Sequence, residues 1–323
     1  LKVPEAKKST VDVTIGQKIR SELGKTEFKL MHVVKDEHGA LTAFPVKGTS
    51  GTITGLERAD GYCVIDRGTE FLNTGDKAVL HLFRDRELIS EVVFVGSHDY
   101  VLDMLFGEYR KKYPNRLVKK FFTGSTGGLS AIAKKECDIT GIHLLDPKTK
   151  QYNRPYLERY AIGNSVAFVP GYKRIQGIYT AKDNPKGIRG LRDFLRPETR
   201  MINRSEGSGT RILFDSLIND LAMQVGLTSQ EICSSISGYR TSALSHTACA
   251  TAVAEGAADV AIGIEQYSKI YDLGFIPLAE EEYDLLVAKS SINKPEVADF
   301  LLLFNSSEFR SNVISKFPNT RWC

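Results

Sequence analysis

From residue 91 onward the sequence repeats one unit, a short apolar strand followed by a small polar loop and a helix. The apolar run Val92–Val95 leads through Gly-Ser-His to a helical pattern over Tyr100–Tyr109. The run Val118–Phe122 leads through the glycine-rich loop 124–128 to a second helical pattern. Alternating strands and helices predict a parallel sheet with helices on its faces. Ligands of such sheets bind where the strands end, so these polar loops are the first candidates for a site.

The stretch 203–211, Asn-Arg-Ser-Glu-Gly-Ser-Gly-Thr-Arg, precedes a strongly periodic helix. Apolar residues then recur at every fourth position: Leu213, Leu217, Leu221 and Val225. This stripe predicts a helix that begins near Ser208 or Gly209 and ends at Gly226. The first backbone N–H groups of a helix have no partner within the helix, and its dipole is positive there, so an oxyanion can bind at this end.

The residue types at this helix start favour an anion site. The glycines allow backbone N–H groups to approach a ligand closely, Ser208 and Thr210 add hydroxyl donors, and Arg211 adds a planar guanidinium. Two other roles for Arg211 stay open. It could form a surface ion pair beside an ordinary Ser/Thr N-cap, or it could hold an opposing lobe through Glu206 or another carboxylate.

An internal similarity predicts two lobes. The segments 131–139 and 252–260 share a pattern of small apolar helix residues, a tight turn, an aspartate and a buried strand with constant spacing. The helix-opening pairs before them, Ser125-Thr126 and His246-Thr247, also correspond. Two such α/β units would face each other across a cleft that is lined by helix N-termini. The later segment 283–288 is expected to return as a strand and to lead terminal helices back onto the first lobe.

Residues 1–88 have a different pattern, with β-rich pieces between glycine-rich turns. The expected strands are Phe28–Val34, Leu41–Phe44, Tyr62–Ile65 and Ala78–Phe83. They predict a small β-barrel or an open sheet. The charged segment 84–87 would join this module, residues 1–88, to a second domain, residues 89–323.

Composition excludes several classes of function. The formal net charge is only +4 and the charges are mixed, so the sequence predicts no nucleic-acid partner. Apolar runs are too short to span a bilayer, so no membrane association is expected. Five cysteines without a C-x-x-C pair favour reduced thiols in the cytoplasm, and no metal site is expected. The loop 124–128 matches neither a P-loop nor a nucleophile elbow, and adjacent His and Asp residues are usually structural, so no catalytic residue is assigned.

Residues 91–323 resemble the type II periplasmic-binding-protein-like family, the class shared by molybdate/tungstate solute-binding proteins and LysR-type effector domains. The resemblance implies an α/β domain of two lobes, lobe I over 89–178 and 275–323 and lobe II over 179–274. The motifs that carry it are Arg174-Ile175-Gln176-Gly177, Asn184-Pro185, Ile202-Asn203-Arg204, Gly207-Ser208-Gly209-Thr210-Arg211, Ser245-His246-Thr247, and Ile276-Pro277-Leu278 before Glu282-Tyr283-Asp284.

Residues 1–88 resemble the C-terminal β domain of the molybdopterin molybdotransferase (MoeA/gephyrin) family. The carriers are Ala43-Phe44-Pro45-Val46, Gly48-Thr49-Ser50-Gly51, Leu56, Ala59-Asp60-Gly61-Tyr62 and Gly75-Asp76. The combination looks like the C-terminal half of a fusion whose catalytic domain, which would hold molybdopterin and metal, is expected upstream of this chain. Whether the chain takes part in catalysis therefore stays open. The family likeness also implies a homodimer.

The two-lobed resemblance implies a ligand site at the helix starts. The implied residues are Ser97, His98, Ser125, Thr126, Ser208, Gly209, Thr210, Arg211 and Thr247. The expected ligand is molybdate or tungstate, held by hydroxyls and N–H groups without a metal or a covalently bound cofactor. A molybdopterin-type ligand, with its ring stacked on Tyr239 or Tyr283, is the larger alternative. A purely structural or regulatory role for the lobes is the other hypothesis.

Overall fold

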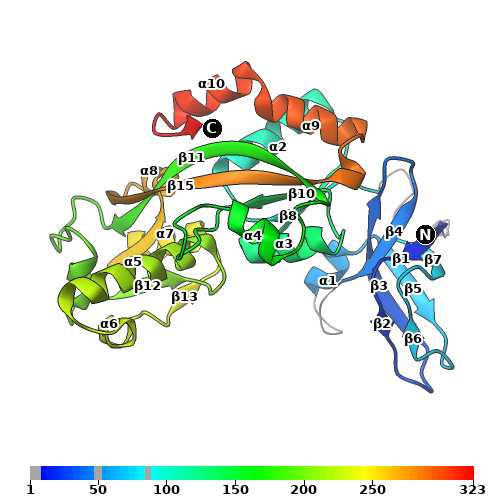
Figure 1. Cartoon of the computed structure of the whole chain (residues 1–323), viewed down its shortest axis with the longest axis horizontal. Coiled ribbons are helices and arrows are strands. Elements are labelled where there is room, and N and C mark those ends of the chain that lie inside the picture. Colours follow the sequence, from blue (N-terminus) through cyan, green and yellow to red (C-terminus); the bar gives the residue numbers. More distant parts are fainter. Residues whose placement is uncertain (1–8, 47–52, 84–88) are drawn as a thin grey trace, which may run out of the picture.

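The computed structural model describes residues 9–46, 53–83 and 89–323, and the expected charged joint at 84–87 lies outside these ranges. The chain forms a small β-barrel followed by an α/β part with two lobes, and the three units follow one another along the long axis of the molecule (Figure 1). The predicted fold class, a two-lobed α/β domain preceded by a barrel-like β domain, is confirmed.

The N-terminal module is a closed barrel rather than an open sheet. Its strands, in the order β1-β4-β3-β5-β7, are β1 (Thr10–Ile15), β4 (Leu41–Pro45), β3 (Glu27–Lys35), β5 (Gly61–Ile65) and β7 (Lys77–Leu82). A short hairpin pairs β2 (Ile19–Arg20) with β6 (Phe71–Leu72), and helix α1 covers Ile53–Arg58. Alternate residues such as Val11, Val13 and Ile15 point inward, as the two-residue period of a strand requires.

One mixed sheet runs through both lobes, in the order β13-β12-β14-β11-β15-β10-β8-β9. Lobe I contributes β8 (Val92–Gly96), β9 (Val118–Phe122) and β10 (Ile139–Ile142), in which β8 is parallel to both neighbours. Lobe II contributes β12 (Met201–Arg204), β13 (Ser242–Ala243) and β14 (Val260–Ile264), in which β12 is parallel to both neighbours. The short β16 (Arg321–Trp322) pairs with β11.

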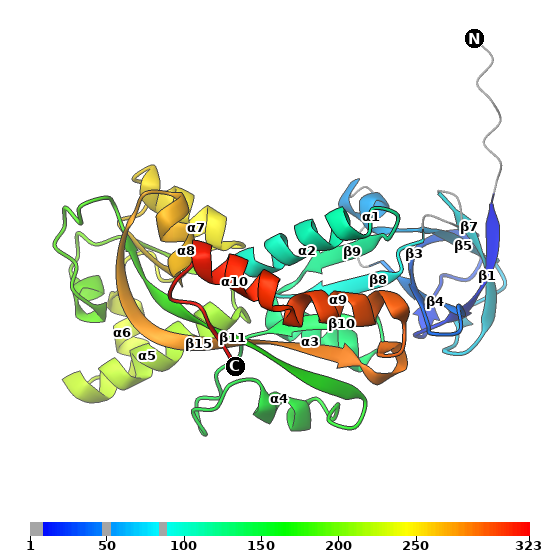
Figure 2. The same cartoon turned by 90° about the horizontal axis from the view of Figure 1, so that it is seen from above.

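Two long antiparallel strands connect the lobes, β11 (Val166–Thr180) and β15 (Gly274–Ala288), and both figures show them crossing from one lobe to the other (Figures 1 and 2). The sequence predicted a strand only over 283–288, the second part of β15, and it missed β11. In the sequence, the three consecutive glutamates 280–282 look like an interruption between two strands. They are accommodated in the strand because Glu281 pairs with Arg174, whereas Glu280 and Glu282 pair with Lys173.

Helices cover both faces of the sheet. In lobe I, α2 (Tyr100–Lys112), α9 (Pro295–Asn305) and α10 (Ser307–Lys316) pack on one face, and α3 (Gly124–Ala133) and α4 (Arg154–Arg159) on the other. In lobe II, the helices are α5 (Gly209–Val225), α6 (Ser229–Ser235), α7 (His246–Ala254) and α8 (Glu265–Ile270). Short 3-10 helices cover Leu191–Leu195 and Lys289–Ser291. No helix within the described ranges is both long and apolar enough to cross a bilayer.

Helix α5 begins and ends where the sequence predicts. Ser208 is its N-cap, and its hydroxyl accepts a hydrogen bond from the backbone N–H of Arg211. Gly226 ends the helix in the left-handed conformation, at φ +71°, which glycine adopts without strain. The expected lobe limits, 89–178 with 275–323 and 179–274, fall inside β11 and β15 and remain a proposal.

The barrel docks on lobe I. Val34 and Phe44 of the barrel belong to the same apolar core as Leu129 of α3. The Lys294 ammonium donates to the backbone oxygen of Lys35 at 2.8 Å. Lys294 is buried and is the N-cap residue of α9, so this hydrogen bond connects the barrel to the start of α9.

Candidate functional site at the junction of the lobes

Helix starts from both lobes meet where the lobes touch. The hydroxyl of Thr126, in the first turn of α3, donates to the backbone oxygen of Gly207 at 3.2 Å. Gly209, the first residue of α5, lies so close to His143 that a methyl group in its place would overlap the carbonyl oxygen of that residue. Glycine at position 209 therefore permits contact between the lobes at this point.

The side chains at the start of α5 are already engaged. Ser208 caps its own helix and donates to the backbone oxygen of Ser205 at 2.8 Å. The Thr210 hydroxyl accepts from the amide of Gln176 at 2.8 Å. The Arg211 Nε donates to Asp215 at 2.9 Å, so Arg211 forms an ion pair within its own helix, one of the roles that the sequence left open. Arg211 is buried in this pair, whereas the Asp215 side chain is 41% exposed.

A chain of hydrogen bonds joins the first helix start to the hinge strand β15. The Ser97 hydroxyl lies 2.7 Å from Nε2 of His143, and Nδ1 of His143 lies 2.9 Å from the Glu281 carboxylate. Since a carboxylate only accepts, Nδ1 carries the hydrogen and Nε2 accepts the hydrogen of Ser97. Burial lowers the pKa of His143, which keeps the ring neutral. The hydroxyl of Ser125 accepts from the His143 backbone N–H at 3.1 Å.

A fully buried ionic cluster lies at the hinge. Arg174 of β11 is directly opposite Glu281 of β15 and donates through Nε to Oε1 at 2.6 Å. Arg174 also pairs with Asp99, the N-cap residue of α2. Burial alone would raise the pKa of Glu281, but Arg174 and the hydrogen bonds from His143 and Gln176 outweigh it and lower this pKa to about 2. Two carboxylates thus neutralise Arg174.

On the lobe II side, Arg204 is buried without a carboxylate. It ends β12 with 9% of its surface exposed, and its Nη1 donates to the Ala243 backbone oxygen at 3.3 Å. Its Nε has no hydrogen-bond partner among the described residues, and none of their carboxylates pairs with it. Burial lowers the pKa of Arg204, yet a guanidinium stays charged in proteins. An uncompensated positive charge is therefore buried at this junction, at a cost of several kcal/mol.

Like Arg204, His246 is buried and has a side-chain nitrogen without a hydrogen-bond partner among the described residues. It is the first residue of α7, is 2% exposed and stacks on Tyr267, with ring centroids 5.5 Å apart. Its Nδ1 has no partner among the described residues. Burial, and then the charges of Arg204 and Arg174, lower the pKa of His246 well below its ordinary value. Both unpaired groups thus lie in one positively charged neighbourhood.

A second contact between the lobes involves His98. Its Nδ1 lies 3.2 Å from the Tyr267 hydroxyl, and its Nε2 lies 2.8 Å from the Asp103 carboxylate. Thr247, in the first turn of α7, is exposed and interacts with the same hydroxyl. The starts of α2 and α7 therefore meet through Tyr267.

Most of the residues expected from the sequence are brought together here. Ser97, Ser125, Thr126 and Ser208–Thr210 gather at the α3/α5 contact, and His98 and Thr247 gather at Tyr267. Arg211 differs, because its guanidinium lies over Tyr239 and against Asp215. A ligand ring cannot stack on Tyr283, which is fully buried against Tyr172. In the described part of the chain, no group of three or more His, Cys, Asp or Glu side chains is placed to hold a metal ion.

The residues that sequence reasoning missed are those whose partners come from distant segments: Arg174, Arg204, His246, Tyr267 and Glu281. Arg204 and His246 lie in motifs that were recognised, Ile-Asn-Arg and Ser-His-Thr, but a motif does not show that a charge lacks its counterion. The position of Arg204 at the end of a buried strand was the one available signal.

This two-lobed fold with helix starts at the hinge defines the class to which the chain belongs, the periplasmic binding protein (PBP) superfamily. The model described as PBP superfamily domain matches residues 106–305, and the MoeA C-terminal region (domain IV) matches residues 12–83. Among individual relatives, the uncharacterised protein YvgK of Bacillus subtilis (strain 168) is 32% identical over 221 residues, which cover 68% of either chain.

Solved structures share the fold at low identity. The sulfate-binding protein SubI from Mycobacterium tuberculosis H37Rv is 14% identical with a TM-score of 0.51, over 70% of this chain and 85% of that one. The tungstate ABC transporter from Geobacter sulfurreducens is also 14% identical with a TM-score of 0.51, over 70% of this chain and 98% of that one. These likenesses concern the architecture.

Proposed function

We propose that the junction between the lobes binds a small oxyanion, molybdate or tungstate, as part of molybdenum cofactor biosynthesis. The observation that carries the proposal is the buried guanidinium of Arg204, whose charge has no described counterion. A buried charge of this kind costs stability unless a partner offsets it, and a dianion is a partner that would do so.

The available hydrogen bonds are sufficient for an anion to bind with micromolar affinity or better. A hydrogen bond to a charged group contributes about 1.5–3 kcal/mol, whereas micromolar binding needs about 8 kcal/mol. Arg204, His246 and those first N–H groups of α5 and α7 that the N-cap serines do not bind would supply several such bonds after the ordering cost. Both helices are long enough for their dipoles to favour negative charge at these ends.

The direction of the Ser97 hydrogen bond limits which protonation state of the ligand can bind. Its hydroxyl hydrogen is committed to His143, so the hydroxyl can offer only lone pairs to an arriving oxygen. An oxyanion without a hydrogen would be repelled there. Protonation of His143 turns Nε2 into a donor and releases the Ser97 hydrogen for the anion. We infer that a fully deprotonated dianion such as molybdate binds together with one proton.

Ligand entry requires the lobes to separate. The contacts that join them are Thr126 to Gly207, Gln176 to Thr210, and His98 to Tyr267. The two strands that cross between the lobes, β11 and β15, have register irregularities between Val169 and Tyr172 and between Gln176 and Gly177. Motion about these points would open the junction while both strands stay paired.

The choice of ion draws on the rest of the chain. The MoeA C-terminal region over residues 12–83 supports a link with molybdenum chemistry, and the fold neighbours include proteins named for sulfate and tungstate. The same region supports the expectation of a cytoplasmic homodimer. The competing proposal, that the lobes bind a molybdopterin-type ligand or serve only in assembly, predicts no response to the free ions.

Calorimetric titration with molybdate, tungstate, sulfate and phosphate tests the proposal, with chloride at equal ionic strength as the control. Molybdate and tungstate should bind with a one-to-one ratio and raise the melting temperature. If neither ion binds between pH 6 and 8, the oxyanion proposal is wrong. Binding of molybdopterin alone would then support the alternative.

A further inference from the structure

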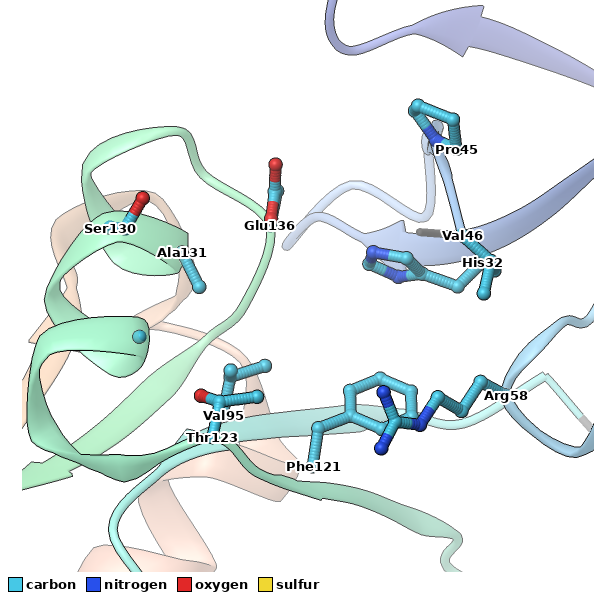
Figure 3. A pocket seen from close by; sticks show the side chains of 11 residues that line it. His32, Pro45, Val46, Arg58, Val95, Phe121, Thr123, Ser130, Ala131 and Glu136 are labelled. Atoms are coloured by element: carbon cyan, nitrogen blue, oxygen red, sulfur yellow. The ribbon is translucent and has the colours of Figure 1, made fainter. Parts of the chain in front are cut away.

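A cavity lies between the barrel and lobe I, away from the junction of the lobes. Its volume is about 240 Å³. Figure 3 shows barrel residues on one side, His32 and Arg58 among them, and residues of α3 and β9 on the other. Its position depends on the docking of two folding units, so the cavity exists only in the assembled chain.

His32 gives this cavity an unused polar atom. Its side chain is 8% exposed, and Nδ1 has no hydrogen-bond partner among the described residues. The ring is held by stacking on Phe44, with centroids 5.5 Å apart, and by an edge contact with Phe121 at 5.8 Å. Figure 3 shows the imidazole directed into the cavity. A buried polar atom without a partner costs about 1–3 kcal/mol, which a ligand group could recover.

His32 would act as a neutral hydrogen-bonding group rather than as a charge. Burial, with a smaller effect of the Lys119 charge, lowers the pKa of His32 to about 3. A neutral imidazole offers one N–H donor and one acceptor nitrogen. Such a directional contact suits a ring nitrogen or a carbonyl group of a ligand.

The remaining walls favour a flat ring with a negative group. Phe121 presents an aromatic surface, and the small residues Ser130 and Ala131 of α3 lie across the cavity from it. Gly127 of the same helix also lines the cavity. The Arg58 guanidinium lies 5.7 Å from the Phe121 ring centroid and forms no ion pair with a described carboxylate. Glu136 lines the side across from Arg58, and Arg58 is the cation among the lining residues, so a negative group on the ligand would be attracted toward Arg58.

We propose that this cavity binds a planar aromatic heterocycle that carries a carboxylate or phosphate group. The ring lies between Phe121 and α3, a ring heteroatom bonds to His32, and the negative group pairs with Arg58. A ring system of one or two fused rings fits about 240 Å³, which is smaller than a typical drug-sized pocket.

Three small probes separate the components of this proposal in saturation-transfer NMR and calorimetry on the whole chain. Quinoline-2-carboxylate has both ring and charge, 2-methylquinoline has the ring alone, and cyclohexanecarboxylate has the charge alone. The first should bind with a dissociation constant at or below about 1 mM, and the other two at least 5-fold more weakly. Equal binding of all three, or no binding by the first, would overturn the proposal.

Variants then locate the binding. Ser130→Phe fills the cavity and should abolish binding, and Arg58→Gln should weaken the binding of quinoline-2-carboxylate at least 5-fold but not that of 2-methylquinoline. The matched control is Arg154→Gln, because Arg154 lies over Phe168 elsewhere on lobe I with its guanidinium 4.2 Å from the ring centroid. Saturating tungstate should leave the affinity unchanged. If Ser130→Phe, with a wild-type melting temperature, still binds the probe, the cavity is not the site.

Discussion

Replacement of Arg204 by methionine should change stability and binding in opposite directions. Methionine keeps an unbranched apolar side chain and removes the charge. In the ligand-free protein, Arg204 is buried with an unpaired Nε and no described carboxylate. Its removal eliminates a desolvation penalty but also loses the bond to the Ala243 oxygen. Because an unpaired buried charge costs several kcal/mol and that bond contributes about 1.5–3 kcal/mol, we expect a net stabilisation of about 1–2 kcal/mol.

The same substitution should weaken binding of tungstate. Loss of one charge-assisted contact of about 1.5–3 kcal/mol corresponds to an affinity about 10- to 150-fold lower. Scanning calorimetry without ligand should show the α/β transition at a higher temperature, by about 2–4 °C per kcal/mol. Isothermal titration with tungstate gives the affinity. Each measurement is made on the same preparation at the same ionic strength.

Arg211→Met is the matched control. Arg211 is buried in the same lobe, but Asp215 neutralises it, with Nε 2.9 Å from the carboxylate. Its removal leaves Asp215 without that partner, so we expect lower stability and an affinity within about 3-fold of the wild type. If Arg204→Met destabilises the ligand-free protein as Arg211→Met does and leaves tungstate binding intact, the assignment of Arg204 to an anion site is wrong.

Three further predictions concern protons and the contact between lobes. The pKa of His32 is about 3 when folded and about 6.5 when unfolded, so the unfolded chain takes up the proton first as pH falls. His32 alone should therefore lower the free energy of unfolding by about 2 kcal/mol between pH 6.5 and pH 5, and His32→Leu should show a total fall smaller by that amount in denaturant titrations at these pH values. Tungstate binding should take up about one proton at pH 7.5, measured as a dependence of calorimetric enthalpy on buffer ionisation, and His143→Gln should abolish this dependence. Gly209→Ala should hold the lobes apart, with a larger radius of gyration in X-ray scattering with tungstate; an unchanged radius would contradict the packing against His143.

Local signals in the sequence were sufficient for much of the fold. Ser208 and Gly226 delimit α5 because a cap and a left-handed glycine act within one helical turn. The barrel follows from alternation and turns, although closure by the parallel pair β1 and β4 depends on contacts that no local pattern encodes. Strand β11 was missed because its apolar residues are interrupted by Lys173, Arg174 and Gln176, whose partners lie on distant segments: β15, α5 and the N-cap residue of α2.

The candidate site was predictable in position but not in electrostatics. Helix starts that follow strands could be found from small polar residues, and these do meet at the junction. The state of Ser97 could not be found in this way, because it depends on His143 and Glu281, which lie 46 and 184 positions further along the chain. Whether Arg204 has a counterion is likewise a property of the assembled lobes.

The hinge and the junction share one ionic residue, Glu281, and under the proposed function this sharing would link ligand binding to lobe movement. Glu281 holds Arg174 directly across from it on β11, and it also fixes the hydrogen on Nδ1 of His143. A proton taken up by His143 would strengthen its bond to Glu281 and make the Ser97 hydrogen available for an anion. The anion would at the same time neutralise Arg204 on the opposite lobe. Proton, anion and closed lobes would therefore stabilise one another, because each removes a charge imbalance that the others leave.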